Sequence, residues 1–322
     1  MEIKTKLTEM LGIKYPIIQG CMQWFATADL AAAVSNAGGL GIISSASFRN
    51  SEELRDEIRR CKTMTDKPFA VNLSLFPSLN PVGYHEHIKV IAEEGVKIVE
   101  TAGRAPDEYI GELKAANITV IHKCVAVKHA LKAQTIGCDM VVIDGYEAAG
   151  HIGDFNTATM VLTPKAVDAL SIPVITAGGI CDGRTLAAAL MLGAEGGYMG
   201  TRFFMTKECP AVAAVKEELA NSYNETDTYI ALRPYKNTTR FVMNDIMKQV
   251  AVNEAAGEPF PTVAPLVAGV KTLQLTKDGG VLDDGSLCIG ENIGNIHDVP
   301  TVAELVERMM KECEEALSKF SK

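Results

Sequence analysis

Apolar stretches of six to eight residues alternate with longer amphipathic stretches over the first two hundred residues of the chain. Eight of them begin 21 to 33 residues apart, which is the spacing of one strand followed by one helix. Their near-continuous apolar character is typical of parallel strands buried on both faces. The predicted strands are residues 15–20, 40–45, 69–75, 97–102, 118–124, 140–145, 173–180 and 196–203.

The stretches between them have helical periodicity, and several begin at Ser, Asp or Pro and end at Gly or Asn, which are helix start and stop signals. The clearest are residues 28–38, 51–64, 84–95, 106–117 and 127–137. Eight strand–helix units predict an α/β fold of the TIM-type (β/α)8 barrel class. The alternative is an open doubly wound sheet, but no GxGxxG turn follows the first strand and eight is the number that closes a barrel.

The pattern changes after residue 207. Residues 208–284 mix helix-like and irregular stretches, and their apolar content argues against a disordered linker. We interpret them as an inserted, mainly helical substrate or lid domain that could cover the barrel mouth. Residues 301–320 have helical periodicity and are expected to dock back on the barrel, so residues 1–207 and 285–322 form the barrel domain.

Composition narrows the class of protein. Of 322 residues, 47% are hydrophobic and 22% charged, and the formal net charge of −9 argues against binding to nucleic acid or to anionic membranes. No apolar stretch reaches the roughly 18 residues of a membrane span, and residues 1–16 lack the order of a signal peptide. We therefore expect a cytoplasmic protein. None of its eight cysteines has CxxC spacing, so neither a metal site nor a dithiol motif is predicted.

Polar residues occur at the ends of the apolar strands, where barrel enzymes carry their active sites. In chain order they are Gln19, Ser44, Asn72, Thr101, Lys123 and Asp144. Because these ends meet at one rim, the residues predict a polar ligand site. A lysine within an apolar strand needs an anionic partner. For Lys123 this is either a bound cofactor or, in a purely structural role, Asp144 or Glu147.

Glycines mark the ends of the last two strands. Gly178 and Gly179 follow the seventh strand, and Gly200 with Thr201 follows the eighth. Adjacent glycines let the backbone approach an anion, and the loops after these two strands are the usual phosphate site of the fold. The alternative interpretation is two tight turns without a ligand.

His151 lies between glycines in the stretch AAGHIG, on the loop after the sixth strand. Its position at the predicted rim makes it the candidate acid or base. His85, His87 and His129 fall on helix patterns and are interpreted as surface residues, while His122 should face away from Lys123 because strand neighbours alternate. No Ser-His-Asp spacing, HExxH or Walker sequence supports a hydrolase or a nucleotidase.

Seven motifs together resemble the nitronate monooxygenase family, formerly the 2-nitropropane dioxygenases, which includes flavin-dependent enoyl-ACP reductase II enzymes and NADH:quinone reductases. They run in order over most of the first 210 residues. They are PIIQGCMQW (16–24), AVSNAGGLG (33–41), PFAVNLSL (68–75), VIHKC (120–124), DGYEAAGHIG (144–153), ITAGGICDGRTL (175–186) and YMGTRF (198–203).

The resemblance implies that FMN binds at the barrel mouth, with NADH or NADPH as a candidate co-substrate. It places His151 beside the flavin as the catalytic residue. Many relatives have glycine at the position of Cys21, whose thiol is either a packing variant or a modifier of the redox site. The implied cofactor-binding residues are Gly20, Met22, Asn72, Lys123, Asp144, Ala149, Gly150, Gly178, Gly179, Gly200 and Thr201.

The resemblance leaves the small-molecule substrate open. Members of the family oxidise alkyl nitronates with O₂, or use NAD(P)H to reduce quinones or, as the alternative, enoyl thioesters. The stretches 20–24, 97–103, 120–133 and 199–210 are most similar to the quinone-reductase group. The resemblance also leaves the oligomeric state open, and a homodimer is one candidate assembly. The competing hypotheses are a non-catalytic FMN- or phosphate-binding barrel and a flavin-free phosphosugar isomerase or aldolase.

Overall fold

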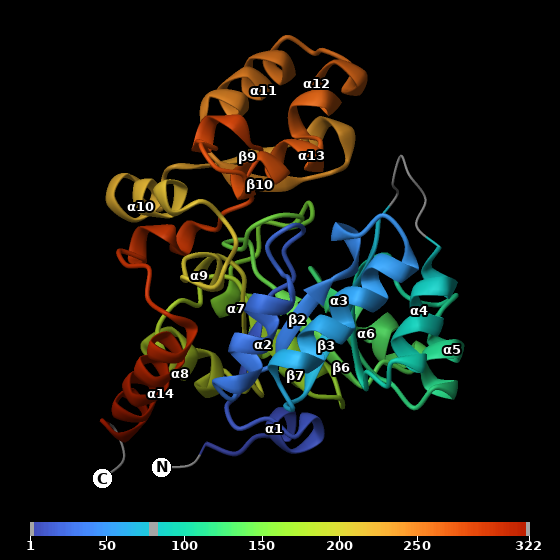
Figure 1. The fold of residues 1–322 in the computed structure, drawn as a ribbon. Helices are drawn as coiled ribbons and strands as arrows, with labels where there is room; N and C mark the ends of the chain where they lie inside the picture. Colours follow the sequence, from blue (N-terminus) through green and yellow to red (C-terminus); the bar gives the residue numbers. More distant parts are fainter. Residues whose placement is uncertain (1–2, 77–82, 320–322) are drawn as a thin grey trace.

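The computed structural model of the chain describes residues 3–76 and 83–319, and its centre is a closed parallel barrel (Figure 1). The strands are β1 (Ile17–Gln19), β2 (Gly41–Ser44), β3 (Phe69–Leu75), β4 (Ile98–Gly103), β5 (Thr119–Cys124), β6 (Met140–Asp144), β7 (Val174–Ala177) and β8 (Gly197–Met199). Consecutive strands pair from β2 to β8, and β8 pairs with β1. A parallel bridge between Ile18 and Leu40 joins β1 to the start of β2 and closes the ring. The predicted TIM-type barrel is confirmed.

A helix follows every strand and packs on the outside of the barrel. These helices are α2 (Ala28–Asn36), α3 (Ser51–Met64), α4 (Tyr84–Glu93), α5 (Ile110–Ala115), α6 (Val127–Ile136), α7 (Thr159–Ala169), α8 (Gly183–Met191) and α9 (Thr201–Phe204). Local signals fix several ends: the Asn50 side chain accepts from the N–H of Glu53 at the start of α3, and Gly137 ends α6 with φ of 101°. The helical stretches predicted from the sequence are therefore found as α2 to α6.

One end of the barrel is closed by apolar packing. Helix α1 (Lys6–Leu11) lies across the amino-terminal ends of the strands, and its Leu7 and Leu11 join Ile18, Ile42 and other interior residues in one buried cluster. Apolar side chains therefore fill this end of the barrel. The carboxyl ends of the strands face the opposite side of the molecule (Figure 1).

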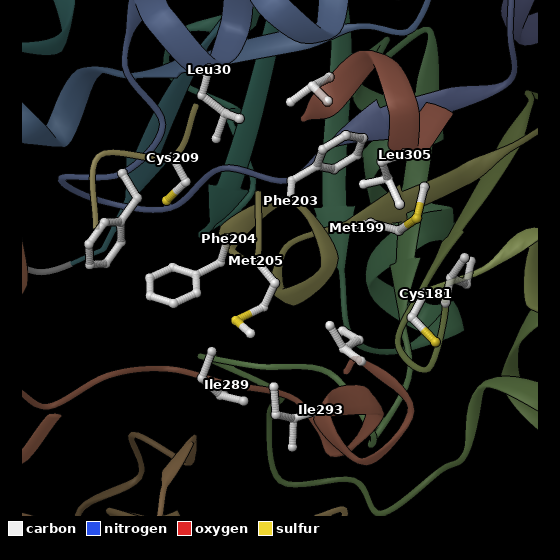
Figure 2. Close-up of a cluster of buried hydrophobic side chains, with 14 of the residues drawn as sticks. Leu30, Cys181, Met199, Phe203, Phe204, Met205, Cys209, Ile289, Ile293 and Leu305 are labelled. Atoms are coloured by element: carbon white, nitrogen blue, oxygen red, sulfur yellow. The ribbon is translucent and has the colours of Figure 1, made fainter. Parts of the chain in front are cut away.

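The eighth predicted strand was too long. Residues 196–203 were expected to be extended, but β8 ends at Met199 and α9 begins at Thr201. Phe203 and Phe204 are fully buried, and Figure 2 shows them among side chains of the C-terminal region such as Leu305 and Ile289. A short apolar stretch does not distinguish strand from helix, so this packing decided the conformation.

The C-terminal third adds two parts. Helix α14 (Val302–Ser318) begins at a Thr301–Glu304 capping box and packs along α8, as predicted for residues 301–320 up to the last described residue. Between β8 and α14 lie α10 (Ala213–Ser222), β9 (Thr228–Ala231), β10 (Thr239–Val242), α11 (Asp245–Ala255), α12 (Phe260–Val267) and α13 (Gly269–Thr272).

Residues 228–267, called the hairpin unit below, have a hydrophobic cluster of their own built on Phe241, Met247 and Val250. The antiparallel pair of β9 and β10 was not predicted. The unit lies beyond the barrel end opposite α1 (Figure 1). Helix α10 instead packs through Val215 and Leu219 into the larger cluster with α14, so the separate domain 208–284 stays a prediction. Within the described residues, no helix combines the length and the apolar character that crossing a membrane requires.

Candidate active site

Four polar side chains on successive strands share the interior face of the barrel near its carboxyl rim. Asn72 of β3 pairs in register with Glu100 of β4, and Lys123 of β5 lies two positions further up the barrel, opposite Ala102. Asp144 ends β6 on the same face. Asn72 and Glu100 are fully buried and Asp144 is 4% exposed. Strand alternation therefore gathers an amide, two carboxyls and an ammonium around one point.

Lys123 and Asp144 form an ion pair. The Lys123 Nζ lies 2.8 Å from Asp144 Oδ2, and the two side chains are 18% and 3% exposed. Burial by itself would lower the pKa of Lys123, but the attraction and hydrogen bond of Asp144 and the charge of Glu100 raise it. The lysine therefore has an anionic partner within the protein, as its structural interpretation required.

Glu100 was not identified from the sequence. The strand end was assigned to Thr101, but Thr101 faces the helices, where its Oγ1 lies 2.8 Å from His122 Nδ1. Glu100 points inward, accepts a hydrogen bond from Asn72 at Oε2, and has no partner at Oε1. Burial raises its pKa to about 7, against the opposing effects of Lys123 and Asn72. A charged residue inside the apolar stretch 97–102 was the signal that could have revealed it.

His151 is half-buried on the loop after β6. Its ring stacks on Phe76 at the end of β3, with centroids 4.2 Å apart and planes 25° from parallel. Burial and the charge of Lys123 lower the imidazole pKa to about 4, against the effect of a hydrogen bond with Asn237. At neutral pH the imidazole is therefore uncharged. Since residues 77–82 lie outside the described part of the chain, Phe76 is the last residue placed on that side.

The loop that carries His151 is fixed to the hairpin unit. The Gly150 N–H donates to Arg240 O at 3.1 Å, and the Arg240 N–H donates back to Gly150 O at 2.8 Å. The Arg240 side chain is 3% exposed, donates to Tyr146 O at 3.0 Å and pairs with Glu291 at 2.8 Å. Its guanidinium also lies over the Tyr146 ring, 4.9 Å from the centroid. No sequence motif pointed to Arg240.

Ala149 lies in the same loop, against the segment that precedes α14. A side chain at Gly290 would lie 2.8 Å from Glu147 O and 3.3 Å from Ala149 N. The Glu291 N–H donates to Glu147 O at 3.0 Å. The loop is thus packed on two sides, which gives His151 a defined position although glycines flank it.

The predicted glycines divide into two groups. Gly179 and Gly150 have φ of 75° and 74°, and an added Cβ at either position would meet nothing within 4 Å. Gly20 and Gly178 are enclosed instead: an added Cβ would lie 2.8 Å from Tyr198 Cε1 at the first and 2.7 Å from Thr159 Oγ1 at the second. The first pair leaves room for a ligand against the backbone, whereas the second pair serves close packing.

Gly200 and Thr201 begin α9, whose first N–H groups have no acceptor within the helix. Met22 lies close by, because an added Cβ at Gly200 would be 3.9 Å from its Sδ. Thr201 is buried, and its Oγ1 accepts a hydrogen bond from the Gly290 N–H at 3.0 Å. This leaves the Thr201 O–H as a donor.

Cys21 lies beneath the rim. Its N–H donates to Tyr198 Oη at 2.8 Å, and burial together with the charge of Glu100 raises the pKa of its thiol far above the usual range. The thiol is therefore protonated and acts as a small apolar group at this position.

These features fit the flavin that the family resemblance implied. Glu100 Oε1 is buried without a hydrogen-bond partner, and a bound heteroaromatic ring edge would supply one. Gly150 and Gly179 offer backbone at open, left-handed positions. The donors at the start of α9 suit a phosphate. The roles of the individual residues stay predictions.

The other histidines are placed as follows. His122 faces away from Lys123, as predicted, and is 2% exposed. His85 and His129 are exposed on helices, as predicted. His87 is buried, contrary to the prediction, because its Nδ1 lies 3.0 Å from Gly83 O and draws the ring against the helix start.

Comparisons with known proteins agree with this architecture. A model described as nitronate monooxygenase matches residues 4–312. The (3aS,4S,5R,7aS)-5-hydroxy-7a-methyl-1-oxo-octahydro-1H-indene-4-carboxyl-CoA dehydrogenase of Rhodococcus jostii is 34% identical, over 95% of this chain and 94% of that protein. A probable nitronate monooxygenase of Staphylococcus saprophyticus is 36% identical, over 71% of this chain and 76% of that protein. The structure of FabK from Thermotoga maritima superposes with a TM-score of 0.91 at 34% identity, covering 98% of each chain.

Proposed function

Because this chain belongs to the nitronate monooxygenase family of oxidoreductases, we propose that it is an FMN-dependent enzyme that uses NAD(P)H to reduce a neutral, carbonyl-conjugated acceptor, with a quinone as the first candidate. The observation that carries the proposal is the uncharged His151, stacked on Phe76 at the carboxyl rim of the barrel. Bound FMN would supply the group that takes hydride from a nicotinamide and passes two electrons to the acceptor.

The charges of the site favour a neutral acceptor over an anionic nitronate. Lys123 is paired with Asp144, and Arg240 is paired with Glu291. An uncharged His151, hydrogen-bonded to Asn237 through one ring nitrogen, has its other ring nitrogen left for a neutral acceptor and brings no positive charge to an anion. Nitronate oxidation is therefore the less favoured reaction of this site.

The residues of the chain would divide the work of holding the cofactor. The open backbone at Gly179 and the first turn of α9 from Gly200 and Thr201 would hold the phosphate. Asn72 and the Lys123–Asp144 pair would meet the polar edge of the ring. Gly20, Met22, Ala149, Gly150 and Gly178 would shape the surface against which the ring lies.

An enoyl thioester is the second candidate acceptor. The Rhodococcus relative, which matches 95% of this chain, carries a CoA thioester in its name. An α,β-unsaturated thioester also presents a neutral carbonyl to His151. Quinones and enoyl thioesters differ in size and in the tail that they carry. The sequence motifs at the rim do not distinguish between them.

The test is an anaerobic titration of the purified protein with NADH and then NADPH, followed by the absorbance of bound flavin. Bleaching is expected with at least one nicotinamide, and rapid reoxidation by 1,4-benzoquinone but not by an enoyl-CoA would identify the quinone. The reverse preference would identify the thioester. A flavin that stays oxidised with both nicotinamides, in protein that consumes O₂ with an alkyl nitronate, would overturn the reductase. Protein that neither contains nor takes up FMN would overturn the proposal that the cofactor is a flavin.

A further inference from the structure

The buried cluster at the barrel rim contains two carboxyls but one ammonium. Glu100 and Asp144 are 0% and 4% exposed, and Lys123 is the cation between them in strand order. With both carboxyls ionised, the cluster would carry an uncompensated buried negative charge, which is costly in a low-dielectric interior. One dissociable proton shared by the carboxyls makes the cluster neutral.

The contacts assign that proton to Glu100. Asp144 receives the Lys123 ammonium directly, at 2.8 Å, so the pair satisfies its charge. Glu100 receives one neutral amide donor from Asn72. Burial is the largest effect on Glu100 and raises its pKa to about 7, and the negative charge of Asp144 acts in the same direction.

The other groups that face Glu100 do not titrate near neutrality. Burial raises the pKa values of the Cys21 thiol and the Tyr198 hydroxyl well above their usual ranges. The pKa of Lys123 is raised by Asp144 despite burial. Asn72 and Ser44 carry no charge. Burial also raises the pKa of Asp144, against the attraction and the hydrogen bond of Lys123. Glu100, which has no cation bonded to it, is therefore the member of the cluster assigned a change of protonation around pH 7.

No acceptor for the proton on Glu100 is found among the residues that the structure describes. Oε2 accepts from Asn72, so the second oxygen is the position for the proton, and Oε1 is buried without a partner. Ser44 Oγ is also buried on the interior face, on β2, with Asn72 of β3 between it and Glu100, and the Cys21 thiol is its one weak contact among the described residues. An unpaired carboxyl oxygen and a weakly bonded hydroxyl on the same interior level indicate a ligand whose polar atoms complete both.

We propose that Glu100 is a positioning residue for the cofactor: it holds a proton at neutral pH and donates it in a hydrogen bond to an acceptor atom of the bound flavin. This inference rests on the proposed function. It makes cofactor binding depend on pH through a carboxyl on the floor of the site, separately from His151 on its rim. Loss of the proton would leave a carboxylate facing that acceptor and weaken binding.

The experiment measures the Kd of FMN for apoprotein by fluorescence quenching between pH 6 and pH 9. For the wild type, the Kd is expected to rise by roughly 50-fold between pH 7 and pH 9, because the fraction of protein with a protonated Glu100 falls over that range. Glu100→Gln keeps a donor and should flatten this dependence. Glu94→Gln is the matched control: Glu94 is a carboxylate paired with Arg55, Arg59 and Lys62 on the outer helices, and its loss should leave the slope unchanged.

An unchanged slope in Glu100→Gln would overturn the inference while leaving the flavin in place. Apoprotein that takes up no FMN at any pH would overturn the proposed function and the donation with it. The proton itself is tested without cofactor, by following the side-chain carboxyl carbons of ¹³C-glutamate-labelled wild type through a pH titration. A resonance that titrates near pH 7, and is missing from Glu100→Gln, is expected. Should that variant not fold, a wild type in which every glutamate titrates below pH 6 would still contradict the proposal.

Discussion

The backbones of Gly150 and Arg240 pair as an antiparallel bridge, with N–H to O distances of 3.1 and 2.8 Å. This bridge joins the loop after β6, one residue before His151, to β10 of the hairpin unit. Residues ninety positions apart are thereby held together at the barrel rim. The position of the candidate catalytic histidine consequently depends on a part of the chain that contributes nothing to the barrel.

Arg240→Met tests that dependence. The change removes the ion pair with the partly exposed Glu291 and the hydrogen bonds to Tyr146 O and Thr228 Oγ1, while the backbone bridge remains. Loss of these three interactions of a buried guanidinium should together lower the free energy of unfolding by about 3 kcal/mol. Turnover, measured by steady-state rates, should fall more than flavin content, measured by the absorbance of the bound flavin.

Arg233→Met is the control for that change. Arg233 is exposed and bonds Asn156, so its loss should cost less than about 1 kcal/mol. Equal effects of the two changes would contradict a special role of Arg240.

His151→Ala should leave the flavin bound and slow turnover by roughly 100-fold, because the acceptor loses the imidazole that orients it. The Phe76 ring also loses its stacking partner, so a small loss of stability is expected in thermal unfolding. His151→Asn keeps a donor and should recover part of the rate. Unchanged rates with a quinone, an enoyl-CoA and a nitronate would remove the histidine from the mechanism.

Gly179→Asp should yield protein without flavin. The added side chain enters space that the protein leaves open and brings a negative charge to the proposed phosphate site. Gly257→Asp controls for backbone strain, since Gly257 has φ of 72° against 75° for Gly179 and is equally open, but follows α11. Both variants should lose similar stability. Stoichiometric FMN in Gly179→Asp would exclude the phosphate assignment.

His122 should make the protein sensitive to acid. Burial lowers its pKa to about 4, so between pH 6.5 and pH 4 this imidazole is protonated in the unfolded chain but not in the folded chain. Stability carried by the neutral ring is therefore present at pH 7 and falls as the pH drops through 6.5 toward 4. Between pH 7 and pH 5 this contribution is about 2 kcal/mol.

Urea unfolding of the wild type and of His122→Asn at both pH values measures that contribution. The difference in unfolding free energy between pH 7 and pH 5 should shrink by about that amount in the variant. The comparison isolates His122 because His151, whose pKa is also lowered, is present in both proteins. An identical pH dependence would show that His122 does not titrate as its burial requires.

The barrel and most of the candidate site followed from local patterns. The strand spacing gave eight units, and the ends of β3, β5 and β6 gave Asn72, Lys123 and Asp144, all of which face the interior. The end of β4 was misassigned by one residue. Because side chains alternate, that single step exchanged inward-facing Glu100 for outward-facing Thr101.

What the sequence determined by itself is the order of strands and helices, and with it the rim where polar strand ends and glycines collect. These depend on hydrophobic period and on residue-specific backbone preferences, which act over a few positions. Tertiary structure alone decided that α9 is helical and that Arg240 fixes the His151 loop. It also decided that burial raises the pKa of Glu100 to about 7 and leaves one of its carboxyl oxygens without a hydrogen-bond partner. Each of these results from contacts between distant segments, which determine the electrostatic environment and the packing that a residue experiences.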